Sequence, residues 1–213
     1  MIDRRVFGTA GLAAVALSMS VLLLPGCLGR SPEVGHFVLG AGVAAEQSAD
    51  GLSDLAVLVG PVRLPAYLER PQIARLERGG EVELDEFNRW LGGFKENLLR
   101  SLSLDLAARL GSVKVVAHPS AAPFPFDYRV RLHVDDFVFV RDEGAIRARI
   151  RWALTRAGSG DPAGLFVLER TVPVDSDSAE NLVAAHVTVL SDLASKIATE
   201  MAHIERLSSP PAP

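Results

Sequence analysis

Two runs of strict alternation between apolar and polar residues constrain the fold more than any other feature of this sequence. The first runs from Tyr128 to Val134 and the second from Ile146 to Leu154, and in both the apolar side chains occupy even-numbered positions. Side chains of a β-strand point alternately to the two faces of its sheet, so each run predicts a half-buried strand. The turn sequence Asp142-Glu143-Gly144 predicts that they form an antiparallel hairpin, and Phe166 to Val174 predicts a third strand of the same parity.

The parity of the hairpin also predicts its register and the residues on its second face. A loop from Arg141 to Ala145 places Val134 opposite Trp152. The same register places Asp135 opposite Arg151. The second face would then carry two aromatic and two cationic side chains: Phe137, Phe139, Arg147 and Arg149. Such a face would contact a partner or anionic headgroups, or its arginines would simply stack on the aromatic rings as ordinary cross-strand pairs.

Two segments show the three- and four-residue spacing of apolar side chains that is typical of amphipathic helices. The first predicts a helix from about Glu86 to Leu110, with Asp85 as its N-cap and Gly111 as its C-terminal stop. The second runs from Val183 to Ile204, and Asp177 begins a capping box before it. Each segment has a single apolar stripe, so each helix should lie on a sheet.

Shorter β runs complete the predicted fold: Leu55 to Val59, Glu81 to Leu84 and Val113 to Ala117. The sequence therefore predicts an α+β fold, a single domain with a largely antiparallel or mixed sheet and two amphipathic helices packed on one face. Each of the five histidines stands alone in the sequence. Neither a phosphate-binding loop, nor a paired-histidine metal motif, nor a nucleophile elbow is found. We therefore expect a protein that is not an enzyme, and the acidic net charge of −4 gives no indication of nucleic-acid binding.

The N-terminus has the layout of an export signal. Arg4 and Arg5 precede an apolar stretch from Val6 to Leu24, and Leu24-Pro25-Gly26-Cys27 follows directly. Cys27 is the only cysteine of the chain and occupies the position of the lipid-modified residue in a lipoprotein signal. We expect covalent diacylglycerol and N-acyl lipid on Cys27 and no other cofactor. An uncleaved membrane anchor is the alternative, and both the twin-arginine and the general secretion routes fit the two arginines.

These signals divide the chain into four parts. We expect a signal peptide (1–26), a lipidated cysteine with a flexible tether that includes one strand-like patch (27–51), one folded domain (52–207) and a disordered tail (208–213). The residue after Cys27 is Leu28, and the absence of Asp at this position favours the outer membrane over the inner membrane. The domain would lie on the periplasmic side of the cell envelope.

The segment from Val59 to Arg75, which contains three prolines, gives the most specific indication of function. The run from Val62 to Ile73 reads V-R-L-P-A-Y-L-E-R-P-Q-I, and an Arg-Trp pair follows after a short polar stretch. This pattern resembles the ABC-type transport auxiliary lipoproteins, a family that includes the paraquat-inducible lipoproteins of Gram-negative envelopes. The residues that carry the resemblance and become candidate contact or structural residues are Leu64, Pro65, Tyr67, Leu68, Arg70, Pro71, Gln72, Arg89 and Trp90.

The resemblance implies a role without chemistry. Members of this family are thought to serve lipid-transport systems built from an ABC transporter or permease and a mammalian-cell-entry (MCE) protein, which links the two membranes. The expected partners are therefore the membrane, an MCE-domain protein and transporter components, and self-association into a homo-oligomer is part of the same expectation. Two alternatives remain: an outer-membrane lipoprotein regulator of a cell-wall synthase, and a soluble lipid carrier with a deep apolar cavity.

Overall fold

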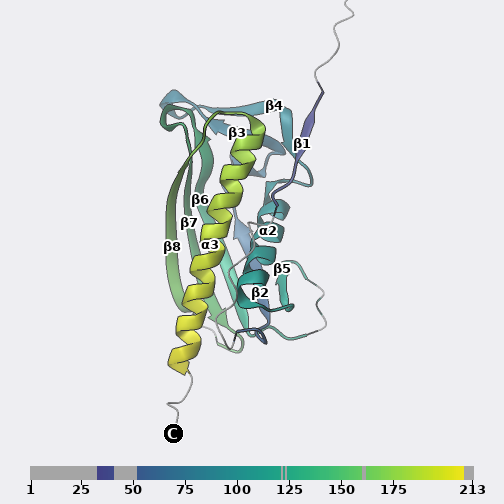
Figure 1. The fold of residues 1–213 in the computed structure, drawn as a ribbon, viewed down its shortest axis with the longest axis vertical. Helices are drawn as coiled ribbons and strands as arrows, with labels where there is room; N and C mark the ends of the chain where they lie inside the picture. Colours follow the sequence, from purple (N-terminus) through teal and green to yellow (C-terminus); the bar gives the residue numbers. More distant parts are fainter. Residues whose placement is uncertain (1–32, 41–51, 121, 123, 160–161, 209–213) are drawn as a thin grey trace, which may run out of the picture. The chain divides into compact units, whose positions relative to one another are not determined.

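The fold is built on a curled, mixed sheet of eight strands, and the long strand β6 (Tyr128–Val140) lies in its middle. The helices pack on one face of this sheet (Figure 1). The computed structural model describes residues 33–40, 52–120, 122, 124–159 and 162–208. Strand β7 (Ala145–Arg156) is antiparallel to β6, and β8 (Pro162–Pro173) is antiparallel to β7. These three strands form the meander that the alternating sequence predicts.

Shorter strands line the other side of β6. The strands β2 (Val57–Arg63) and β3 (Gln72–Leu76) are both parallel to β6, β2 along its first half and β3 along its end. The sheet continues from β2 to β5 (Val115–Ala117) and from β3 to the antiparallel strand β4 (Val82–Trp90). The three-residue strand β1 (Gly35–Phe37) is parallel to β4, so the strand-like patch expected within the tether joins the sheet.

The helices α2 (Phe94–Leu110) and α3 (Ala179–Ser208) lie side by side on the concave face of the sheet (Figure 1). Their buried leucines and those of β6 and β7 form one apolar core. Three short 3-10 turns connect strands: η1 (Ala66–Glu69), η2 (Arg78–Gly80) and η3 (Arg141–Glu143). The predicted α+β fold with two helices on one face of a mixed sheet is confirmed.

The first helix begins later than predicted, because residues 86–90 belong to β4. The carboxylate of Asp85 does accept hydrogen bonds from the backbone N–H groups two and three residues later, at 2.9 and 3.0 Å, as an N-cap would. It does so at an irregularity of the strand instead of a helix start. Gly92 and Gly93, with φ of 77° and 89°, form the turn before the helix. The helix ends at Gly111 as predicted, and Gly111 has the left-handed conformation.

The start of α3 also differs from the predicted capping box. The backbone N–H of Asn181 donates to the Ser178 hydroxyl, so Ser178 takes the capping position. Asp177 instead accepts a hydrogen bond from Arg141 at 2.6 Å, and this ion pair holds its pKa below the ordinary value. By length and hydropathy α3 could span a bilayer, but its apolar side packs in the domain core.

The predicted register of the hairpin is wrong, because β6 contains a bulge at Asp135. Before the bulge Leu132 faces Trp152 and Val134 faces Ile150, and after it the pairing shifts by one residue. An inserted residue reverses the inward and outward positions of everything that follows it in the strand. Phe137 and Phe139 are therefore buried in the core, at 0% and 3% exposure, and the predicted aromatic outer face does not exist.

The described residues from Val34 onward form one compact unit, which contains every strand and helix described above. The buried Asn97 of α2 ties the segment after β1 to this unit, because its Oδ1 accepts a hydrogen bond from the Leu39 backbone N–H at 3.0 Å. The predicted signal peptide, Cys27 and residues 209–213 of the predicted tail lie outside the described residues, whereas Ser208 is the last residue of α3.

Candidate functional site

The proline-rich segment connects β2 to β3 through η1, and its leucines pack in the domain core. Leu64 and Leu68 are buried at 8% and 4% exposure. The hydroxyl of Tyr67 donates a hydrogen bond of 2.9 Å to Asp136 of β6, and burial together with this carboxylate raises the pKa of Tyr67 above its ordinary value. The segment is therefore fixed at both its apolar and its polar contacts.

The two halves of the sequence signature meet in the sheet, although sixteen residues lie between Gln72 and Arg89 in the chain. Gln72 of β3 lies opposite Arg89 of β4. The backbone N–H of Trp90 donates to the carbonyl of Pro71 at 2.7 Å. We call this region, residues 64–72 with Arg89 and Trp90, the signature corner. The two parts of the sequence signature therefore form one region of the folded protein.

Only part of the signature corner is accessible to another molecule. Arg70 and Pro71 are exposed, whereas Leu64, Leu68 and Trp90 are buried. Arg70 has no ion pair or hydrogen bond with the described residues. Gln72 Oε1 and Arg89 Nε are also buried without a hydrogen-bond partner among these residues. An atom in that state costs about 1–3 kcal/mol unless water or a bound group satisfies it.

An aromatic cluster underlies the signature corner and contains a histidine that sequence reasoning missed. The Trp90 ring lies 5.3 Å from that of Phe94 and 5.4 Å from the imidazole of His186, centroid to centroid. Phe137 lies 4.7 Å from the same imidazole. Burial lowers the pKa of His186 to about 4, so the ring is neutral at pH 7, and its Nδ1 lies 2.7 Å from the Leu182 carbonyl. The position of His186 between the apolar residues Leu182 and Val189 of α3 was the available signal.

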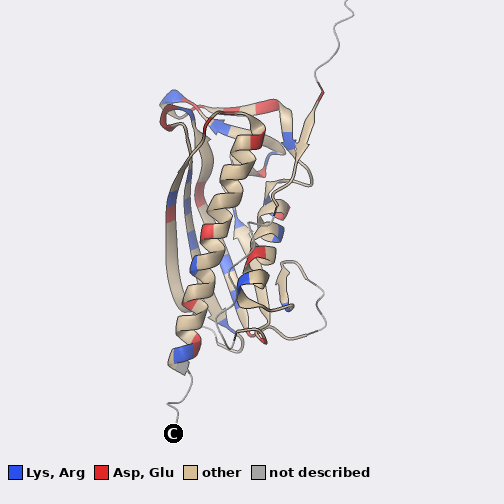
Figure 2. Cartoon of the chain, in the orientation of Figure 1, with Lys and Arg blue, Asp and Glu red and all other residues tan. Residues whose placement is uncertain are grey.

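The outer face of the hairpin carries ion pairs instead of aromatic rings. Arg147 donates to Asp136 at 2.8 Å and to Glu143 at 2.6 Å. Arg149 pairs with Glu169 at 2.9 Å. Figure 2 shows basic and acidic positions close to one another along the ribbons of these strands. Arg149 is thus exposed and Arg147 is half-buried, and both are paired with carboxylates of the protein.

The predicted ion pair of Asp135 with Arg151 is confirmed, but the predicted register is wrong, because Arg151 lies opposite His133. Arg151 Nε donates to Asp135 at 2.8 Å, and this contact holds the pKa of Asp135 below its ordinary value. His133 Nε2 lies 3.3 Å from the same carboxylate. Within the described ranges, no group of three His, Cys, Asp or Glu side chains could hold a metal ion.

Comparison with known proteins agrees with this geometry. Residues 37–198 match the model of a family described as the ABC-type transport auxiliary lipoprotein component. The curated proteins include no significant match. Among solved structures, protein XCC0632 from Xanthomonas campestris is similar with a TM-score of 0.62 at 13% identity, over 81% of this chain and 98% of that one. An uncharacterised protein is similar with a TM-score of 0.64 at 16% identity, over 79% of this chain and 99% of that one.

Proposed function

The chain belongs to the family of ABC-type transport auxiliary lipoprotein components, and from this membership we propose that it serves a lipid-transport system of the MCE type as a non-enzymatic accessory. In this proposal the protein is anchored by lipid on Cys27 and docks onto an MCE-domain protein whose ABC transporter lies in the inner membrane. A lipoprotein is held in the cell envelope, and Leu28 after Cys27 supports the outer membrane as its place. The proposed assembly would thereby link the two membranes.

The observation that carries the docking proposal is the exposure of Arg70 and Pro71 on a segment that is otherwise fixed. Buried leucines, the Tyr67 hydrogen bond and the Pro71–Trp90 backbone bond fix the conformation of this turn. A contact surface that is rigid before binding loses little conformational entropy when a partner binds. Arg70 supplies a guanidinium that can pair with a carboxylate of that partner.

A pull-down from crosslinked envelopes tests this function. The full-length lipoprotein is recovered, and mass spectrometry identifies the proteins retained with it. Arg70→Glu is compared with Arg78→Glu, which makes the same charge change on another exposed turn, η2, where Arg78 forms a 3.3 Å exposed ion pair with Asp142. We expect a permease and an MCE-domain protein with the natural chain and with Arg78→Glu, and their loss with Arg70→Glu.

Two other results would redirect the proposal. Recovery of cell-wall synthases in place of transporter components would favour a regulator of peptidoglycan synthesis. Equal recovery of the transporter components with both variants would show that Arg70 is not part of the contact surface. The family membership would be unaffected. Light scattering of the purified chain tests the accompanying proposal of a homo-oligomer, which a strict monomer at high concentration would contradict.

A further inference from the structure

The outer face of β6, β7 and β8 has two halves that differ in charge balance. In the half near the hairpin turn, Arg147 and Arg149 are paired with acidic side chains. In the other half, Arg129 and Arg131 at the start of β6 are exposed, and neither has an acidic partner among the described residues. The chain as a whole has a net charge of −4, so this pair is a local cationic site on an acidic protein.

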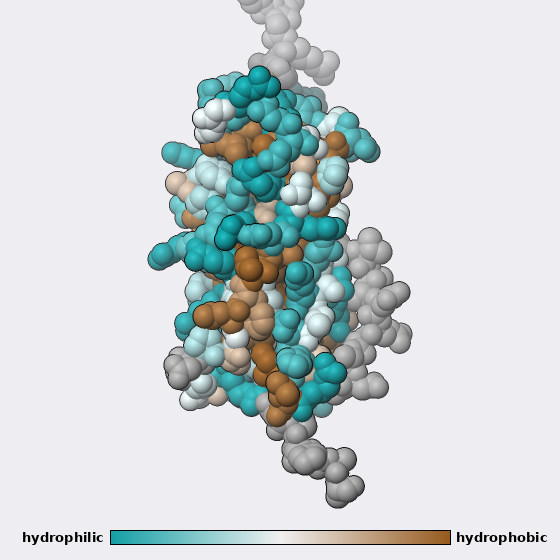
Figure 3. Space-filling view, turned by 90° about the vertical axis from the view of Figure 1, so that its left-hand side faces the viewer, coloured by the Kyte–Doolittle hydropathy of each residue, from teal (hydrophilic) through white to brown (hydrophobic). Residues whose placement is uncertain are grey.

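Apolar side chains lie on the same face on β8, and the strand β7 separates them from the two arginines of β6. Arg131 is opposite Ala153, which is opposite Leu165 of β8, and the next row places Val167 beside Arg151. Leu165 is 75% exposed and Val167 is 48% exposed. Figure 3 shows apolar surface between hydrophilic side chains on this side of the molecule. We call Arg129, Arg131, Leu165 and Val167 the amphiphilic patch.

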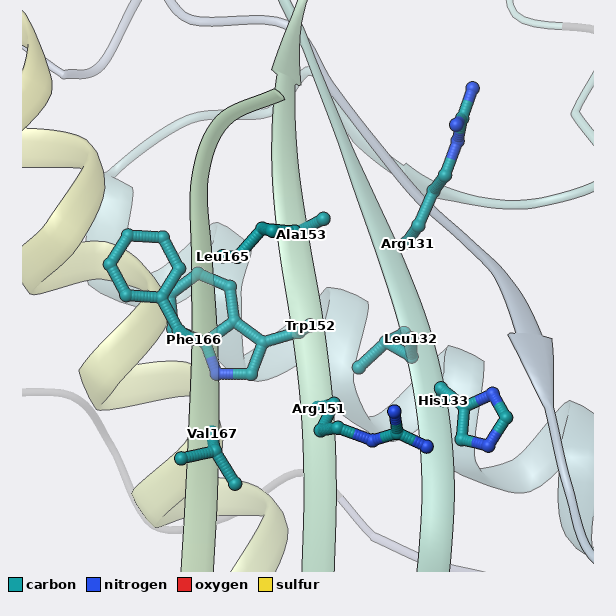
Figure 4. A pocket seen from close by; sticks show the side chains of 9 residues that line it. All are labelled: Arg131, Leu132, His133, Arg151, Trp152, Ala153, Leu165, Phe166 and Val167. Carbon is teal, nitrogen blue, oxygen red and sulfur yellow. The ribbon is translucent and has the colours of Figure 1, made fainter. Parts of the chain in front are cut away.

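The patch borders a shallow, open depression of about 440 Å³ (Figure 4). Trp152 and Phe166 support it from the helix side of the sheet, where their rings stack with centroids 4.2 Å apart. The strands that carry the patch are therefore fixed by packing behind them. Because the backbone is already ordered here, little backbone entropy is lost when another surface covers Leu165 and Val167.

We propose that the amphiphilic patch binds anionic phospholipid at a membrane surface. The guanidinium groups of Arg129 and Arg131 would hold the phosphate of the headgroup, since arginine forms paired hydrogen bonds with phosphate oxygens. Leu165 and Val167 would contact the acyl region next to it. Two residues apart on one strand, the arginines are about 7 Å from each other along the backbone, a separation that lets both reach one headgroup.

Charge complementarity favours a lipid over an acidic protein segment. The patch offers cationic and apolar groups side by side, as an anionic amphiphile requires, and a lipoprotein resides at a membrane where this ligand is abundant. The inference does not depend on the docking partner proposed above, because it uses residues on a different part of the sheet.

Vesicle flotation with unlipidated protein tests the proposal. The chain from residue 28 onward contains the whole folded unit and lacks Cys27, so an anchor cannot account for binding. It is mixed with vesicles of phosphatidylcholine, with or without one-third phosphatidylglycerol. We expect binding to the anionic vesicles alone, and a decrease as salt is raised, because salt screens exposed charges.

Matched variants assign the binding to the patch. Each arginine near an anionic surface contributes about fivefold, so Arg129→Gln with Arg131→Gln should lower the partition coefficient about 30-fold. Lys95→Gln with Lys196→Gln makes the same charge change on exposed residues of α2 and α3, on the helix side of the sheet, and should leave binding unchanged. Leu165→Ser with Val167→Ser should weaken binding without altering its salt dependence. Circular dichroism confirms that each variant is folded.

Several results would overturn the proposal. Equal binding to neutral vesicles, or an equal loss in the lysine control, would show that the patch does not recognise anionic lipid. If glycerol phosphate, at a concentration equal to that of the lipid, fully released the protein from the vesicles, the patch would bind only the anion and would make no apolar contact with lipid. Arginine-dependent binding of an acidic peptide, with none to vesicles, would assign the patch to a protein partner.

Discussion

The signature corner and the outer face of the hairpin both combine arginine with aromatic or apolar residues, but they are held together in different ways. In the corner, Trp90 is buried at 4% exposure and packs on Phe94 and His186. On the outer face, Arg149 and Glu169 form their ion pair at 58% and 61% side-chain exposure. Buried packing contributes several kcal/mol per residue, whereas exposed ion pairs contribute little. We therefore expect substitutions in the signature corner to lower the free energy of unfolding more than substitutions on the outer face.

The largest expected effect comes from Trp90→Ala in the signature corner. Removal of a large buried ring leaves a cavity beside Phe94 and His186, which should lower the free energy of unfolding by about 3–5 kcal/mol. Urea unfolding of the chain from residue 28 onward measures this change. A loss below about 1 kcal/mol would show that the corner does not carry the packing described here.

The pH dependence of stability tests the same cluster. The folded pKa of His186, about 4, lies below the ordinary value of 6.5, so the unfolded chain binds more protons between these values. Stability is therefore fully present above pH 6.5 and is lost as pH falls toward 4, by about 2 kcal/mol between pH 7 and pH 5. Urea unfolding at the two pH values should show this loss in the natural chain. In His186→Phe the loss should be absent from this pH window.

A smaller effect is expected where the corner meets the outer face. Tyr67→Phe removes the hydrogen bond to Asp136, which also accepts from Arg147. The free energy of unfolding should fall by about 1 kcal/mol, since the tyrosine is half-buried and its aromatic packing remains. Thermal unfolding of the two proteins in the same buffer gives the difference. An unchanged midpoint would mean that η1 is held by its leucines alone.

The smallest effect is expected for Arg149→Ala on the outer face. An ion pair exposed to this extent contributes about 0–1 kcal/mol, and the contribution should vanish in high salt. A loss comparable to that of Trp90→Ala would erase the distinction between the two regions. Urea unfolding at low and high salt separates these outcomes.

The fold class, the hairpin and the end of the first helix at Gly111 could be predicted from the sequence, because each depends on local periodicity or on a single residue type. The predictions were wrong at two places where pairing between strands determines the local structure. The stretch from Glu86 to Trp90 is drawn into β4 because it pairs with β3 and β1, and tertiary pairing overrides local propensity. No glycine or proline in the sequence indicates the bulge at Asp135, so Phe137 was predicted on the outer face although it is buried in the core.

The candidate site could be predicted in part. The signature residues were found as a pattern, and the sheet register explains why Gln72 and Arg89 belong together. The division into buried Leu68 and exposed Arg70 could not be predicted from that pattern, because it depends on how η1 lies against β6. The role of these residues in docking remains a proposal.

Site-specific photo-crosslinking tests the central claim most directly. A photoreactive residue is introduced in cells at Arg70, on the signature corner, or at Arg149, on the outer face, and adducts are identified by mass spectrometry. The account predicts an adduct with an MCE-domain protein from position 70 and none from position 149. An adduct with that protein from position 149 alone, or adducts with cell-wall synthases from position 70, would contradict docking through the signature corner.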